Sequence, residues 1–336
     1  MAIVLGAILA AALVGPVLIK SVERNLEAFF LCAGALAAVA GGQFGWPLLR
    51  AAAREPIALS LAVLGFGTLA RLARPRLDRW FENLLRTTSP RAVYSILILA
   101  LGLLASVITA VVAALFLVEA IALMKLDRRS EIATVVLACF AIGLGAALTP
   151  IGEPLGTIAT AAVAKDFWYL ARLLGPLVVA GIAIVAAIAM LLPVARGGSL
   201  HAGPVEQSWR DVFVRAGKVY MFVAGLVGLS WGLRPLVDVY ISRIPAELLF
   251  WLNSISALVD NATLTAAEIG PSLSAAQQRA VLMGLLISGG MLIPGNIPNI
   301  VAAGRLGIGS REWAAVGLLA GLPLMALCFL TLRWIG

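Results

Sequence analysis

Long runs without a charged residue dominate the chain and restrict what it can fold into. A bilayer-spanning helix needs about 20 predominantly apolar residues, and several runs approach or reach that length. The clearest examples are Ala2–Ile19, Ala28–Leu49, Leu173–Ala195 and Trp313–Leu332. The chain is 62% hydrophobic and only 12% charged, whereas soluble domains are closer to roughly 45–50% and 25%. We therefore expect an all-α polytopic membrane protein, with the first run a transmembrane helix because it lacks the basic start of a signal peptide.

The net charge of +8 indicates membrane orientation rather than nucleic-acid binding. Basic residues gather in the short segments between apolar runs, as they do in cytoplasmic loops of membrane proteins. The stretch Arg71–Arg91 holds six arginines, so we place it in the cytoplasm. Counting spans backwards then puts the N-terminus outside and makes Arg50–Glu55 an external loop. We predict a multi-pass protein of the cytoplasmic (inner) membrane, surrounded by lipid, with no nucleic-acid partner.

Two segments far apart in the chain share an unusual pattern. In Leu148–Pro154 and in Leu292–Pro298, two prolines four residues apart bracket a glycine and a polar side chain. Paired Gly/Pro interruptions of apolar segments at matching places in two halves mark the binding site of many transporters. We therefore predict two broken transmembrane helices, at 131–165 and 280–304.

Two other apolar segments, 92–124 and 245–269, are each too short for two full spans. Each nevertheless begins and ends on the same side of the membrane in the predicted topology. We predict that each is a re-entrant helical hairpin, with tips near Ser106–Thr109 and Ser256–Asn261. Irregular backbone at membrane depth is tolerated only where protein or a water-filled cavity surrounds it. The hairpin tips are therefore expected inside the protein, close to the broken helices.

The counted orientation predicts two inverted-topology repeats, each with a span, a hairpin, a broken helix and a closing span. Two N-terminal transmembrane helices at 1–50 form a scaffold. The first repeat covers 51–196 and includes an amphipathic interface helix at 76–86, where apolar and charged residues alternate at helical spacing. A cytoplasmic loop at 197–217 connects it to the second repeat, 218–336.

The candidate site residues follow from the cost of placing polar groups at mid-membrane, at least about 2.5–3.5 kcal/mol for a charge. Glu153 in the first break and Asp260 at the second hairpin tip are predicted proton-coupling acids. Oxygen-bearing neighbours suit a hard cation. The predicted ion-binding residues are Asp260, Glu153, Asn261, Ser256, Thr149, Gly152, Asn296 and Asn299, with Glu119, Thr109 and Gly295 as further candidates. The structural alternatives are that Asp260 only caps a helix, that Glu153 only bonds to a broken helix, and that Asn296 and Asn299 only satisfy freed backbone. For Glu268, near the predicted outer surface, a solvated role is favoured.

These residues resemble those of a known superfamily. The string Ser-Ala-Leu-Val-Asp260-Asn261 at a hairpin, together with Thr149-Pro150-Ile151-Gly152-Glu153-Pro154-Leu155, resembles the ion-transporter superfamily. Within it, the NhaD-type sodium/proton antiporters and a poorly characterised group of predicted cation transporters are most similar. The resemblance implies a scaffold and a transport domain, a homodimer and an elevator-like motion. Dicarboxylate carriers of the superfamily carry Ser-Asn-Thr at both tips, where this chain has Ser256-Ala257-Leu258 and Thr109-Ala110-Val111.

The resulting hypothesis is a secondary transporter that exchanges a monovalent cation for H⁺ without a cofactor. Na⁺ is the favoured cation. Its ligands are small inorganic ions. An alternative is a Na⁺-coupled transporter of a small anion such as a dicarboxylate or oxyanion; no arginine or lysine stands near either break in the sequence. A remote alternative is an intramembrane enzyme that uses Asp260. Cys32, Cys139 and Cys328 stand singly in apolar runs and are expected to pack as small apolar side chains.

Overall fold

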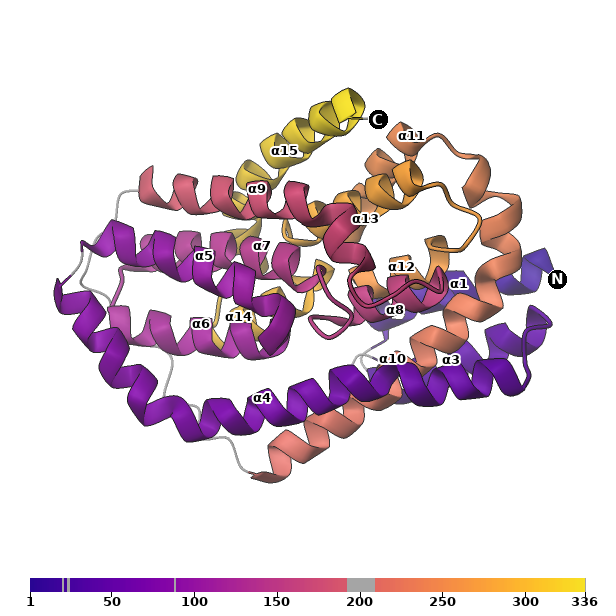
Figure 1. The fold of residues 1–336 in the computed structure, drawn as a ribbon, viewed down its shortest axis with the longest axis horizontal. Helices are drawn as coiled ribbons and strands as arrows, with labels where there is room; N and C mark the ends of the chain where they lie inside the picture. The colour runs from indigo at the N-terminus through magenta and orange to yellow at the C-terminus, as the bar shows by residue number, and fades with distance from the viewer. Residues whose placement is uncertain (20, 23–24, 88, 192–208, 336) are drawn as a thin grey trace.

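The computed structural model describes residues 1–19, 21–22, 25–87, 89–191 and 209–335, and this part of the chain is helical (Figure 1). The elements of the first half are α1 (Ala2–Leu18), α3 (Leu26–Ala40), α4 (Trp46–Thr87), α5 (Pro90–Ile108), α6 (Ala110–Met124), α7 (Arg128–Ala146), α8 (Pro154–Ala162) and α9 (Tyr169–Leu191). Those of the second half are α10 (Trp209–Val239), η1 (Ile241–Arg243), α11 (Ala246–Leu252), η2 (Asn253–Ala257), α12 (Asn261–Glu268), α13 (Ala275–Gly289), η3 (Ile293–Gly295), α14 (Ile297–Leu306) and α15 (Ser310–Ile335).

Several of these helices have the length and composition of membrane spans. In the described residues, five stretches qualify: Arg91–Ile108, Arg128–Ala146, Tyr169–Leu191, Ala216–Val239 and Ser310–Ile335. Three shorter apolar helices lie at Ala2–Pro16, Leu26–Ala40 and Ala110–Met124. The expectation of an all-α chain with multi-pass membrane character is therefore confirmed for the part of the chain that the structure describes.

Helix α4 differs from the prediction, because it continues through the expected external loop at Arg50–Glu55. Its buried residues Leu48, Leu59 and Val63 form one stripe that packs against α10. The charged residues of the expected loop lie on exposed positions of the same helix, so the charges mark a helix face rather than a turn. The predicted interface helix at 76–86 is part of α4, and its side chains lie outside the described residues, as does most of the predicted loop at 197–217.

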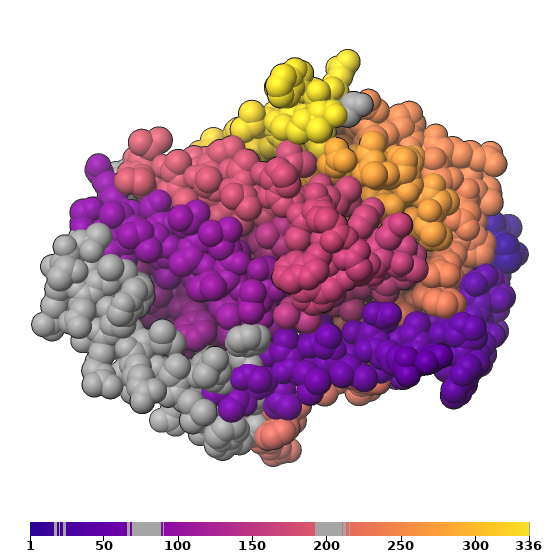
Figure 2. All heavy atoms as spheres, viewed as in Figure 1, coloured from indigo at the N-terminus to yellow at the C-terminus, as the bar shows by residue number. Residues whose placement is uncertain are grey.

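After the N-terminal helices, each half contains the two helices of a predicted hairpin joined by a short connection, then a helix interrupted at a break, then a closing helix. In the first half these are α5–α6, α7–α8 and α9; in the second half they are α11–α12, α13–α14 and α15. Across the halves, α6 packs against α14, and α8 packs against α12. Figure 2 shows the α8 and α9 region, in rose, in the middle of one face between the purple and orange segments.

The N-terminal helices α1 and α3 pack mainly with each other and with α10. Helices α3 and α10 meet through glycines: a Cβ added at Gly34 would lie 2.1 Å from the Gly225 carbonyl oxygen, and one at Gly41 would lie 2.2 Å from that of Gly232. Real Cβ atoms essentially never come within 3.0 Å of another heavy atom in this way. Helix α4 runs along one edge of the molecule beside this pair (Figure 1), so α1, α3, α4 and α10 form one group of helices. This group contacts the rest of the molecule, where α10 packs against α8 and α12 and α4 packs against α5 and α6.

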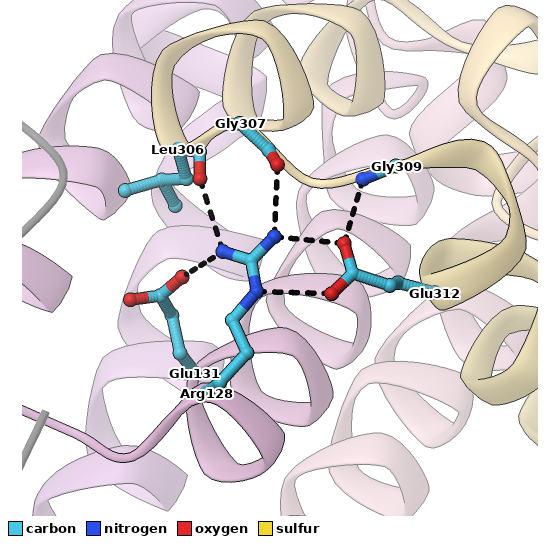
Figure 3. A network of polar contacts seen from close by, with 6 residues as sticks. All are labelled: Arg128, Glu131, Leu306, Gly307, Gly309 and Glu312. Atoms are coloured by element: carbon cyan, nitrogen blue, oxygen red, sulfur yellow. Dashed lines mark hydrogen bonds and ion pairs between the residues drawn. The ribbon is translucent and has the colours of Figure 1, made fainter.

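An arginine connects the two halves at the beginning of α7 (Figure 3). The Arg128 guanidinium donates to both carboxylate oxygens of Glu312 at 3.1 and 2.7 Å, and to Glu131 at 2.7 Å. It also donates to the carbonyl oxygens of Leu306 and Gly307, where α14 ends. Because a planar guanidinium suits bidentate contact with a carboxylate, Arg128 holds the start of α7 against the connection between α14 and α15.

Candidate functional site

The first hairpin tip and the first break are hydrogen-bonded to each other. Between α5 and α6, Thr109 turns the chain with φ of 72°, and its hydroxyl accepts a hydrogen bond from the Val112 N–H. The Ala110 N–H donates to the Gly152 carbonyl at 2.8 Å, and the Thr149 hydroxyl donates to the Ser106 carbonyl. The turn therefore lies within the predicted tip, and Thr149 has a structural partner.

The second hairpin tip packs on the second break in a comparable way. A Cβ at Gly295 would lie 2.5 Å from the Ser256 carbonyl oxygen, so only a glycine fits between η2 and the break. The Ser256 hydroxyl is directed to the Leu285 carbonyl at 3.4 Å. The Asn299 amide donates to the carbonyls of Gly289 and Leu292, both at 2.8 Å. Asn299 therefore satisfies backbone freed by the break.

The second break contacts α7 through Asn296 and Gly143. A Cβ at Gly143 of α7 would lie 2.3 Å from the Asn296 amide nitrogen, so the Asn296 side chain rests directly on the α7 backbone. The Cys139 thiol, one turn earlier, lies 3.6 Å from the Pro298 carbonyl oxygen. Residues of the second break thus lie against the helix that leads into the first.

Glu153 and Asp260 come together from opposite halves of the chain. Glu153 is the N-cap of α8 and Asp260 is the N-cap of α12, and these two short helices pack against each other. A negative side chain is favoured at a helix N-terminus, where the helix dipole is positive. Each acid therefore occupies the helix end at which an external anion would otherwise bind.

The two acids differ in their own hydrogen bonds. One Asp260 oxygen accepts from the backbone N–H and the hydroxyl of Thr263, at 3.0 and 3.1 Å, so the capping role that the sequence left open is present. Glu153 makes no side-chain cap bond and is 1% exposed. One of its carboxylate oxygens has no hydrogen-bond partner among the described protein atoms. Of the two acids, Glu153 is therefore the one that has a buried carboxylate oxygen without a hydrogen-bond partner.

Other buried polar atoms near the breaks share this property. In the described part of the chain, the atoms without a hydrogen-bond partner include one oxygen of Glu153, the amide nitrogen of Asn261, both amide atoms of Asn296 and the amide oxygen of Asn299. These four side chains are at most 2% exposed. An unpaired buried polar atom costs about 1–3 kcal/mol, and native structures contain few. Five of the twelve such atoms found in the described residues belong to predicted ion-binding residues, as expected of polar groups that await a ligand.

A cavity of about 530 Å³ leads to this region between the two groups of helices. Asp260 and Thr263 line it from α12 and its N-cap, Pro154 and Pro294 line it from the two breaks, and α1, α3 and α10 form the facing wall. Lys218 also lines it, although no basic residue stands near either break in the sequence. The cavity gives Asp260 a route to the outside of the fold.

The remaining predicted residues lie further from this centre or have other partners. Glu119 is half-buried on α6. Glu268, for which a solvated role was favoured, is half-buried and accepts a hydrogen bond from the Asn253 amide at 2.8 Å. Asn253 is fully buried; like Thr263 and Lys218, it carries no local sequence signal that points to the site. The Ser288 hydroxyl donates to the Asn253 carbonyl.

The comparisons with known proteins place the chain in a family without giving its activity. A search of curated proteins finds no match. Residues 2–335 match the model of a family described as a protein of unknown function, DUF1646. This match spans nearly the whole sequence, and the chain therefore belongs to the DUF1646 family.

Proposed function

We propose that the protein is a secondary transporter that exchanges a monovalent cation for H⁺, with Na⁺ as the favoured cation. The observation that carries the proposal is Glu153, a buried carboxylate with one unpaired oxygen at the N-terminus of α8. Helix α8 packs against α12, which Asp260 caps, and Asn296 and Asn299 at the second break also hold unpaired amide oxygens. Two carboxylates in a low-dielectric site require positive charge. A dehydrated cation supplies it in one state and a proton in the other, which is the requirement for exchange.

The ligands for the cation come from both halves of the chain. Glu153 and Asp260 provide countercharge, and Asn296 and Asn299 provide amide oxygens. Hard cations prefer such oxygen ligands, and unwound segments of transporter helices typically add backbone carbonyls. Asn261, Ser256, Thr149 and Gly152 belong to the surrounding shell.

An elevator-like motion in the inner membrane is consistent with the two groups of helices. In this proposal α1, α3, α4 and α10 are the scaffold, and the hairpins and broken helices move as the transport domain. The hairpins are re-entrant, the two repeats are inverted with the N-terminus outside, and two copies form a homodimer through their scaffolds. The resemblance to NhaD-type antiporters supports this arrangement.

The test is proton flux in proteoliposomes that contain a pH dye and receive pulses of Na⁺, Li⁺, K⁺ or Ca²⁺. Wild type is expected to respond to a monovalent cation, and Glu153→Gln to lose the response. Asp260→Asn is an informative second variant, because asparagine caps a helix as well as aspartate does, so the fold is kept while the charge is lost. Glu247→Gln, at an exposed position of α11, is the matched control. If neither acid variant affects the response, the assignment is wrong.

One observation favours a second candidate, a Na⁺-coupled transporter of a small anion: Lys218 lines the cavity that contains Asp260. The same vesicles separate the two. If no cation evokes a proton response but a Na⁺ gradient drives uptake of a radiolabelled dicarboxylate or oxyanion, the exchanger is excluded and the anion carrier is supported.

A further inference from the structure

The cavity beside Asp260 contains a second charged pair that the proposed exchange does not yet use. Its walls are mostly apolar, and Glu27 of α3 and Lys218 of α10 line it together with Asp260. The Lys218 ammonium lies 2.7 Å from a Glu27 carboxylate oxygen. These three are the charged side chains among the described residues of the lining. A cation that reaches Asp260 through this cavity therefore enters a space that the Glu27–Lys218 ion pair also lines.

The two partners of this ion pair are not equally fixed. The Glu27 side chain is 17% exposed, whereas that of Lys218 is 51% exposed. Lysine carries its charge on a flexible four-carbon stem and is strongly hydrated. Glu27 stands on the second position of α3, where a negative charge is favoured by the helix N-terminus. Lys218 is therefore the partner that can move out into water, while Glu27 stays in the wall.

We propose that Glu27 binds the transported cation in the cavity before the cation reaches Glu153 and Asp260. When no cation is present, the Lys218 ammonium forms an ion pair with Glu27 instead. This inference rests on the proposed cation exchange. The lysine is then an internal competitor for the cation. The cavity, with a volume of about 530 Å³, has room for an ion with much of its hydration shell. In this proposal the cation loses its remaining water only when it reaches the two breaks.

The competition predicts opposite effects for the two partners. In Glu27→Gln the carboxylate is gone and an unpaired ammonium remains, so the apparent KM for the cation rises. In Lys218→Gln the competitor is gone and the carboxylate is free, so the apparent KM falls. A purely structural ion pair is broken equally by either substitution, and both variants would then shift KM in the same direction.

The experiment measures the initial rate of Na⁺-evoked proton flux in proteoliposomes over a range of Na⁺ concentrations, with ²²Na⁺ binding to the detergent-solubilised protein as a second readout. Each shift is expected to be roughly 3- to 10-fold at low ionic strength and smaller in high concentrations of an untransported salt, because partly exposed charges are screened. Lys218→Arg, which keeps the charge, should remain near wild type.

The matched control is the exposed pair of Asp166, in the connection from α8 to α9, and Arg172, in the first turns of α9. Neither residue lines the cavity. The hydrogen bond from Arg172 lowers the pKa of the Asp166 carboxyl, so this pair is also formed. Asp166→Asn and Arg172→Gln should leave KM unchanged. If the wild type is active but the Glu27 and Lys218 variants leave the KM unchanged or shift it in the same direction, this inference is wrong and the proposed function still stands. A wild type that exchanges no cation for protons overturns the proposed function, and with it this inference.

Discussion

Replacing Gly143 by alanine should move Asn296 without disturbing the backbone around it. An alanine Cβ at this position would lie 2.3 Å from the Asn296 amide nitrogen, and 3.0 Å is the closest approach that real Cβ atoms show. The amide end must therefore shift by at least 0.7 Å (3.0 minus 2.3). Oxygen ligands of the hard cation Ca²⁺ lie within about 2.3–2.6 Å, so a shift of this size takes an amide oxygen out of coordination range.

Gly145, two residues further along the same helix, provides the contrast. There a Cβ would lie 1.7 Å from the Gly102 carbonyl oxygen, so α5 and α7 must separate by at least 1.3 Å (3.0 minus 1.7). Overpacking of a tight contact typically costs about 1–3 kcal/mol. Gly175 of α9, with nothing within 4 Å of a Cβ, is the control, since alanine in an open helical position is favourable by up to about 1 kcal/mol.

The assay combines thermal unfolding in detergent, followed by tryptophan fluorescence, with Na⁺-evoked proton flux. Gly143→Ala should keep a melting temperature near wild type but raise the apparent KM for Na⁺. Gly145→Ala should lower the melting temperature clearly. Gly175→Ala should neither lower the melting temperature nor raise the apparent KM. If Gly143→Ala leaves KM unchanged while Gly175→Ala behaves as expected, Asn296 is not a ligand.

Two further predictions concern stability. Arg128→Met removes four hydrogen bonds that hold α7 to the connection between α14 and α15 and one to Glu131 within α7. Because the groups are partly exposed, the loss should be about 1–2 kcal/mol. Arg128→Lys should recover only part of it, since lysine lacks the fork geometry, and equal melting temperatures for all three proteins would refute a stabilising role. Thr109 has φ of 72° and ψ of 149°, a conformation that costs a residue other than glycine about 1–3 kcal/mol. Thr109→Gly should therefore raise the melting temperature despite the loss of its hydrogen bond to Val112, and a lower melting temperature than that of Thr109→Ser would show that the strain is unimportant.

The parts of the fold that could be predicted are those with local signals in the chain. Proline, glycine and capping residues interrupt α7–α8 and α13–α14 close to where the sequence suggests, and the first hairpin turns at Thr109. Helix α4 was mistaken for two segments because charges at Arg50 and Arg54 resemble a loop, whereas they lie on the exposed face of one amphipathic helix. A charge pattern alone does not distinguish these two cases.

The contacts that shape the site depend on residues from distant parts of the chain. Nothing near Gly143 indicates that Asn296 will rest on it, and nothing near Glu27 indicates Lys218. The sequence does predict which polar side chains are costly at mid-membrane, and Glu153, Asn261, Asn296 and Asn299 are indeed buried. It could not predict that Asp260 would use one oxygen to cap α12 while Glu153 would leave one unpaired.

The glycine contact between α3 and α10 limits how this part of the protein can change during evolution. The atoms that a Cβ at Gly34, Gly225 or Gly232 would meet first belong to the backbone of the other helix. A clash with a side chain can be relieved by a smaller residue at a second position, but a clash with a carbonyl group cannot. No second substitution therefore compensates for losing one of these glycines. Homologues with larger residues there are expected to have a different helix spacing, not a repacked version of the same interface.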